Sequence, residues 1–144
     1  MIRFNYQIAI ICSAFNAEIT EKLLKSTLTR LIKCGVDKNQ IEIFKVPGAI
    51  EIPLIAKFLA LSKKFHAIIS LACVIRGETD HYDYVCQQVS DGCQQIMLEY
   101  TIPVIFGVLT TNNIPQAKKR INKGVEVADA AIDMIKLINN IRKK

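Results

Sequence analysis

The chain lacks several features that point to whole classes of protein. No apolar run approaches the ~20 residues of a membrane-spanning helix, and no basic segment, apolar stretch and cleavage site open the chain. The six glycines and four prolines are scattered, which excludes low-complexity and fibrous arrays. The five cysteines form no CxxC pair and fit reduced, buried thiols better than disulfides or a zinc site. We therefore expect a cytoplasmic protein with no membrane partner and no bound metal.

Motifs for nucleotide and phospho-aspartate chemistry are also missing. The glycines do not fall into GxGxxG or GxxxxGK spacing, and the sequence has no HExxH. A response regulator would need an acidic pair after the first strand and an aspartate after the third, where this chain has Ser13-Ala14 and Ile75-Arg76. Dinucleotide, nucleoside triphosphate and phospho-aspartate chemistry are therefore disfavoured.

Positive charge is in excess but is not concentrated in one place. The chain has 19 lysines and arginines against 13 aspartates and glutamates, a net charge of +6. The excess is spread over helix faces and the terminal Arg142-Lys143-Lys144, without the aromatic-interleaved basic stripe of a nucleic-acid surface. We expect no nucleic-acid partner. An anionic small-molecule substrate, such as a phosphate ester, is the more economical use of the charge.

The length and the hydrophobic pattern predict one domain, residues 1–144, with a single core. The 144 residues are 51% hydrophobic, enough to bury roughly 70% of the unfolded surface. Apolar runs alternate with segments whose apolar residues recur every three or four positions. We expect strands at 8–12, 41–46, 67–75 and 103–109, and helices from 17 to Gly35, at 50–63, at 82–100 and from 114 onward with a break at 122–124. Asn16 is expected to cap the first helix and Gly35 to end it.

Nearly continuous apolar strands that alternate with helices are typical of a parallel sheet covered on both faces. The expected fold is α/β: a doubly wound, flavodoxin-like, four-stranded parallel sheet with helices on both faces, in three layers. Because all four strands run the same way, the turns after them lie along one edge of the sheet, where open α/β folds bind ligands. The chain's less ordinary residues lie in those turns.

The turn after the third strand has the composition of an anion site with a proton carrier. The amides of Gly77, Glu78 and Thr79 would point outward at a helix start, where donors and dipole favour a phosphate. Thr79 would add a hydroxyl or act only as a helix cap, and the Glu78 side chain should face away from an anion. A lone histidine is usually structural, but we interpret His81 as catalytic because it shares this short turn and imidazole exchanges protons near neutral pH.

Other residues of this edge keep two interpretations. Phe15 follows a strand end and either stacks on a flat heteroaromatic ring or packs on the next helix as a staple. Glu51 would accept hydrogen bonds from ligand hydroxyls or simply favour the helix start. Arg120 and Lys123 belong to a basic region that is ordinarily a solvated face, and a phosphate ligand there is the less common outcome. Cys73 is expected to be a core position without an activated thiolate.

Five segments stand out, in order along the chain. They are Phe15-Asn16 with Ile19-Thr20, VPGAIEIP at 46–53, VIRGETDHYDYV at 74–85, PVIFGVLTT at 103–111 and NKGVEVA at 122–128. Together they resemble the 6,7-dimethyl-8-ribityllumazine synthases of riboflavin biosynthesis over nearly the whole chain. The resemblance implies a transferase without metal or other cofactor. It would condense 5-amino-6-(D-ribitylamino)uracil with 3,4-dihydroxy-2-butanone 4-phosphate to lumazine, phosphate and water, the penultimate step of the pathway.

The resemblance also implies a role for each matched residue. Phe15 would stack on the pyrimidine and His81 would move protons. The pyrimidine and its ribityl chain would further contact Ala49, Ile50, Glu51, Cys73, Val74, Ile75 and Phe106. The phosphate would be bound by Gly77, Glu78, Thr79, Arg120 and Lys123. Phe106 and Arg120 would reach a site formed largely by the neighbouring subunit, which implies a homo-oligomer, usually a pentamer, with a 60-subunit shell and an association with riboflavin synthase as further options.

One departure from the family pattern concerns the segment before the last helix. Many relatives have several more residues, rich in glycine and lysine, where only Ile121 and Asn122 separate Arg120 from Lys123 here. The shortened bend argues against Lys123 as a phosphate ligand and weakens any inference about larger shells. Two alternatives would use the same pocket: an archaeal-type riboflavin synthase, which dismutates two lumazines, and a flavin or lumazine carrier without catalysis.

Overall fold

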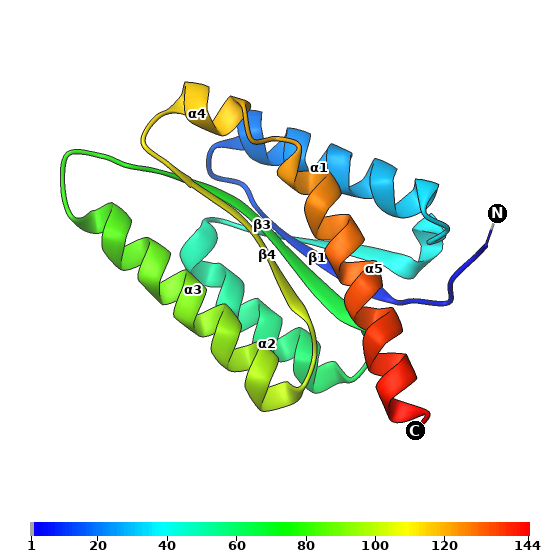
Figure 1. Ribbon diagram of the computed structural model, residues 1–144. Helices are drawn as coiled ribbons and strands as arrows, with labels where there is room; N and C mark the ends of the chain where they lie inside the picture. The colour runs from blue at the N-terminus through cyan, green and yellow to red at the C-terminus, as the bar shows by residue number, and fades with distance from the viewer. Residues whose placement is uncertain (1) are drawn as a thin grey trace.

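Strands and helices alternate along the chain as the sequence predicts (Figure 1). The computed structural model describes residues 2–144. Its sheet consists of β1 (Ile8–Ser13), β2 (Ile41–Val46), β3 (Ala67–Ile75) and β4 (Val104–Thr111), all parallel, in the order β2-β1-β3-β4. The helices are α1 (Ala17–Lys33), α2 (Ile52–Ser62), α3 (His81–Tyr100), α4 (Ile114–Lys118) and α5 (Lys123–Arg142), with 3₁₀ turns η1 (Lys38–Gln40) and η2 (Ala49–Glu51).

The sheet is the middle of three layers. Helices α1 and α5 cover one face and α2 and α3 cover the other (Figure 1). Side chains of β1 alternate between them: Ile8 and Ile10 face α1 and α5, whereas Ala9 and Ile11 face α2 and α3. Because a strand buried on both faces has no polar side, it is apolar at nearly every position. The predicted doubly wound α/β fold is confirmed.

Element boundaries differ from the sequence prediction by one or two residues, as at the start of α3 and the end of β4. The segment from 50 to 63, predicted as one helix, begins as η2 and continues as α2, with Pro53 in the first turn of α2, where its missing N–H costs nothing. The predicted break near 122 separates the short α4 from α5. Helix α4 has five residues.

The two residues expected to bound α1 behave differently. Gly35 ends the helix with φ +107°, a conformation that glycine adopts without strain, as predicted. Asn16 does not cap the helix through its side chain, which makes no capping hydrogen bond, so that prediction is wrong. Its backbone is left-handed, with φ 59°, and the side chain is directed elsewhere, as described below.

Replacing Gly35 with alanine is expected to lower the free energy of unfolding by about 1–3 kcal/mol. The added Cβ would force a positive φ on alanine and overlap the backbone oxygen of Ile2. Thermal unfolding followed by circular dichroism measures the change. Gly77→Ala is the matched control, because a Cβ at Gly77 meets open space. Equal melting temperatures for the wild type and Gly35→Ala would contradict this account.

Candidate active site

The carboxyl ends of β1, β2 and β3 meet the first turn of α3 around a cavity of about 380 Å³. It lies where the strand order reverses, because the chain runs from β1 out to β2 and then returns past β1 to β3. Open parallel sheets bind their ligands at this switch point. Nine of the residues singled out from the sequence line the cavity: Phe15, Ala49, Ile50, Cys73, Val74, Ile75, Gly77, Thr79 and His81.

Phe15 stands in the turn after β1 with 70% of its surface exposed. The turn is fixed by its backbone: the Ala14 N–H donates to the Val46 oxygen at 2.8 Å, and the Phe15 N–H donates to the Pro47 oxygen at 3.0 Å. A hydrophobic staple would bury the ring against the next helix. The exposure therefore favours the other interpretation, in which the ring is free to stack on a flat ligand.

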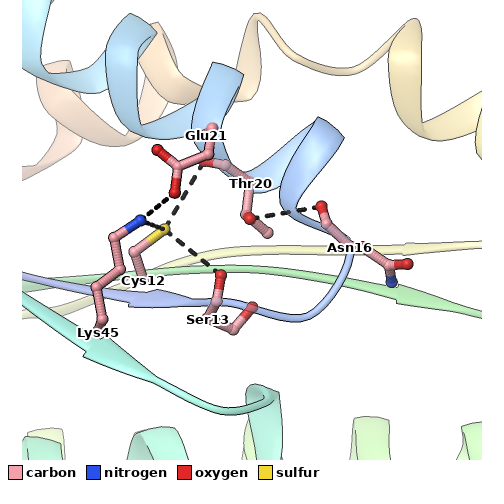
Figure 2. Close-up of polar contacts among 6 residues, drawn as sticks. All are labelled: Cys12, Ser13, Asn16, Thr20, Glu21 and Lys45. Carbon is pink, nitrogen blue, oxygen red and sulfur yellow. Dashed lines mark hydrogen bonds and ion pairs between the residues drawn. The ribbon is translucent and has the colours of Figure 1, made fainter.

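Asn16 connects this turn to β3. Its left-handed backbone directs the side chain away from α1, and Nδ2 donates to the Cys73 oxygen at 2.8 Å. Its own carbonyl accepts a hydrogen bond from the Thr20 hydroxyl at 3.4 Å (Figure 2). Because Phe15 precedes Asn16 and Cys73 lines the cavity, these bonds set the position of the aromatic ring relative to the end of β3.

A second set of polar contacts lies next to the turn after β1 (Figure 2). The Cys12 Sγ lies 3.7 Å from the carbonyl oxygens of Ser13 and Thr20 and 4.0 Å from the Lys45 Nζ. Lys45 also forms an ion pair with Glu21. Burial is the main cause that raises the pKa of the Cys12 thiol. A neutral thiol fits the predicted core position, and the contacts join β1, β2 and α1.

Cys73, Val74 and Ile75 form the part of the cavity wall that belongs to β3. Cys73 is buried, and burial raises the pKa of its thiol to about 11. A thiol with this pKa is protonated at neutral pH and is a poor nucleophile. This agrees with the expectation of a core cysteine without an activated thiolate.

Cys73 is expected to resist alkylation at neutral pH although it lines the cavity. Its labelling rate by iodoacetamide should rise about tenfold per pH unit up to about pH 11, because only the thiolate reacts. Mass spectrometry of labelled peptides measures the rate at each site, with the less buried Cys34 as an internal control that labels first. Rapid, pH-independent labelling of Cys73 would contradict a protonated thiol.

The wall opposite β3 is made by the start of η2. Ala49 and Ile50 line the cavity together with Gly48, which the sequence reasoning did not single out. The Glu51 Oε1 accepts a hydrogen bond from the Gly48 N–H at 2.9 Å, so one carboxylate oxygen fixes the loop. Glu51 is not among the lining residues, and its contact here is with the backbone of its own turn.

The turn between β3 and α3, where the sequence predicts an anion site, is exposed. Among the described residues, no acceptor is present for the N–H groups of Gly77, Glu78 and Thr79. The Thr79 hydroxyl accepts a hydrogen bond from the His81 N–H at 3.3 Å. The N-cap position of α3 is Asp80, whose side chain makes no capping hydrogen bond, so the Thr79 hydroxyl is the side-chain acceptor at the start of this helix. Free amides, a hydroxyl and an imidazole therefore lie together at the N-terminal end of a 20-residue helix.

Comparison with known proteins places this chain in a family. A profile described as 6,7-dimethyl-8-ribityllumazine synthase matches residues 5–139. The chain belongs to this family. It is similar to three proteins named 6,7-dimethyl-8-ribityllumazine synthase from Coxiella burnetii, of strains CbuG_Q212, RSA 493 (Nine Mile phase I) and Dugway 5J108-111. Each is 56% identical over 146 aligned positions, which cover 98% of this chain and 97% of the relative.

Some residues assigned through the lumazine synthase resemblance do not line the cavity of one chain. They are Glu51, Glu78, Phe106, Arg120 and Lys123. Glu78 is not among the lining residues, which agrees with the expectation that its side chain faces away from an anion. Phe106 lies on β4, which β3 separates from β1, and it packs against the core under α2 and α3.

Arg120 and Lys123 lie at the bend between α4 and α5. The Arg120 Nη1 donates to the Gln116 oxygen at 2.9 Å, and Lys123 is the first residue of α5. Helix α5 covers the face of the sheet opposite to α3. Within one lumazine synthase chain, these two cations are therefore not brought to the cavity.

Two further lining residues were missed on α3. Tyr82 follows His81 directly, and Val85, four positions after His81, lies on the same face of the helix as His81. Helical spacing from His81 was a signal that could have found Val85. Gly48 could have been inferred only from the turn in which it stands with Pro47.

Two other kinds of feature are absent from residues 2–144. No helix in this range combines the length and apolar character needed to cross a bilayer. The same range holds no group of three or more histidine, cysteine, aspartate or glutamate side chains placed to bind a metal ion.

Proposed function

We propose that this member of the lumazine synthase family condenses 5-amino-6-(D-ribitylamino)uracil with 3,4-dihydroxy-2-butanone 4-phosphate in the cavity at the carboxyl edge of its sheet. The observation that carries the proposal is the composition of that one cavity. It is lined by the exposed ring of Phe15, by Gly77 and Thr79 at a helix start, and by His81. A flat amine and an acyclic phosphate ester match these groups.

The residues divide into two halves of the cavity. In the proposal, Phe15 stacks on the pyrimidine, and Ala49, Ile50 and the β3 residues Cys73, Val74 and Ile75 enclose the ring and its ribityl chain. Glu51, which fixes Gly48, supports this half and offers its second carboxylate oxygen to a ribityl hydroxyl. The amides of the turn from Gly77 to Thr79 bind the phosphate.

The chemistry requires proximity more than a strong nucleophile. The ring amine attacks the ketone of the butanone phosphate, and an imine forms with loss of water. Phosphate then leaves, and the ribitylamino nitrogen closes the second ring with loss of another water. Because the reactants already carry an amine and a carbonyl, most of the acceleration comes from binding them side by side. His81 contributes a smaller share by carrying protons between these steps.

The active assembly in this proposal is a ring of identical subunits, a pentamer. Phe106, Arg120 and Lys123 complete the neighbouring subunit's cavity, with Lys123 the least well placed because of the shortened bend. Exposed apolar side chains on α2 support such packing: Leu54, Phe58 and Leu61 are 60%, 63% and 54% exposed in the single chain. A 60-subunit shell and an association with riboflavin synthase extend the same proposal.

The remaining parts of the proposal concern the chain as a whole. Residues 1–144 act as one domain, and the protein works in the cytoplasm with small-molecule substrates. Five unpaired thiols support a reducing compartment.

The test of the proposed function is direct. The purified protein is mixed with both substrates, and the absorbance of the lumazine is followed in time. A rate equal to the buffer blank would reject the proposal. Lumazine supplied alone separates the alternatives, because only a riboflavin synthase would form riboflavin from it. A carrier would bind the lumazine and accelerate neither reaction.

A further inference from the structure

We propose that Arg76 is a positioning residue for the turn from Gly77 to Thr79, whose amides bind the phosphate in the proposed function. Its guanidinium makes three contacts, two with α3 and one with the residue after β4: the Cζ lies 4.3 Å from the ring centroid of Tyr82, the Nη2 lies 3.5 Å from the Asp83 Oδ1, and the Nε donates to the Asn112 Oδ1 at 3.1 Å. Arg76 directly precedes Gly77, and Tyr82 follows His81 in the cavity wall. The arginine therefore spans the turn that carries the free amides.

Hydrogen bonds from their backbone N–H groups hold both Arg76 and its partner Asn112 in place. The Arg76 N–H donates to the Thr111 oxygen at 2.9 Å, at the end of β4. The Asn112 N–H donates to the Gln116 Oε1 at 2.8 Å, which attaches the asparagine to α4. The guanidinium thus ties the first turn of α3 to β4 and α4, while the turn from Gly77 to Thr79 makes few contacts of its own.

Each contact alone is weak, because the arginine side chain is 46% exposed and its ion pair with Asp83 is open to solvent. A planar guanidinium stacks on a ring and donates in its own plane at the same time, which an ammonium group cannot do. The three contacts of the guanidinium together therefore restrict the motion of the turn from Gly77 to Thr79. The inference rests on the proposed function for the identity of the substrate, whereas the contacts of Arg76 do not depend on that function.

Arg76→Met is expected to raise the KM for the butanone phosphate about tenfold while the KM for the pyrimidine and kcat change less than about twofold. Asn112→Ala should raise the same KM about threefold. The double variant should have the same KM as Arg76→Met, because both substitutions remove the same contact between Arg76 and Asn112. Arg30→Met is the matched control: it breaks the ion pair between Arg30 on α1 and Asp129 on α5, away from the cavity. It should leave both KM values unchanged.

Arg76→Lys separates positioning from direct binding of phosphate. A positioning residue is not replaced by lysine, so the raised KM should persist. If instead lysine restores the wild-type KM and Asn112→Ala has no effect, Arg76 acts as a charge on the phosphate and the proposal is overturned.

A readout without substrate separates this inference from the proposed function. Hydrogen exchange followed by mass spectrometry should be faster in peptides covering 76–84 in Arg76→Met and Asn112→Ala than in the wild type and Arg30→Met. The bonded amides of Arg76, Asp83 and Tyr84 lie in that range. Unchanged exchange would overturn the positioning role even if the wild type makes lumazine. Faster exchange in a protein that makes no lumazine would reject the proposed function alone.

Discussion

His81→Ala is expected to lower kcat by about two orders of magnitude, the lower end of the range for loss of a general acid–base. The KM values for both substrates should change little, because the imidazole carries protons while other groups bind. Initial rates of lumazine formation measure both parameters. Added imidazole should restore part of the rate, since the truncated side chain leaves space beside Thr79 at the exposed edge of the cavity.

The second histidine provides a matched control for this variant. His66 precedes β3, at the opposite end of that strand from the cavity, where its Nδ1 accepts a hydrogen bond from the Gln7 N–H at 2.8 Å. His66→Ala should therefore keep the wild-type kcat at temperatures where the protein is folded. A kcat for His81→Ala equal to that of the wild type would remove His81 from the reaction and would favour a mechanism in which the enzyme only holds the two substrates together.

Phe15→Ala and Arg120→Ala should each raise the KM for a different substrate. Mixed subunits of the two variants should recover part of the wild-type activity. Loss of the stacked ring should raise the KM for the pyrimidine about 10- to 100-fold. Loss of the guanidinium should instead raise the KM for the butanone phosphate about tenfold. Equal effects on both substrates would contradict the assigned roles.

The mixing experiment follows from the placement of these residues in one chain. Phe15 lines the cavity of its own chain and Arg120 does not, so the proposal draws the arginine from a neighbour. After joint refolding of equal amounts, about one interface in four should combine an intact Phe15 with an intact Arg120. Activity should then rise well above that of either variant alone, to about a quarter of the wild type at low substrate.

Mixing Phe15→Ala with His81→Ala is the control. Both residues line the cavity of the same chain, so no combination of these subunits restores a complete site. If the first mixture stays as inactive as the second, Arg120 does not serve a neighbouring subunit. A native mass equal to one chain of 16.2 kDa would lead to the same conclusion.

The sequence was most informative where burial is complete. β1 and β3 are buried on both faces over most of their length, and their apolar runs marked them directly. Since all four strands are parallel, the turns after them were expected at one edge, and nine predicted residues meet there. Gly35 was predictable for a local reason, because a helix end with positive φ selects glycine.

Contacts between distant segments could not be predicted in this way. The Asn16 side chain was expected to cap α1, but it binds the backbone of Cys73, 57 positions later. Arg76 and Asn112 are 36 positions apart, and nothing in either segment indicates their bond. Which distant residue each side chain binds depends on the strand order, which single-chain periodicity does not specify.

The sequence by itself determined the α/β class, the edge of the sheet that carries the site and the chemical character of the turns there. These depend on hydrophobic period and residue type, which are local properties of the chain. Only the tertiary structure decided that the Phe15 ring is exposed, that Glu51 fixes Gly48, and that Arg120 lies apart from its own cavity. The reason is physical: placing β3 between β1 and β4 fixes distances in space that no spacing along the chain records.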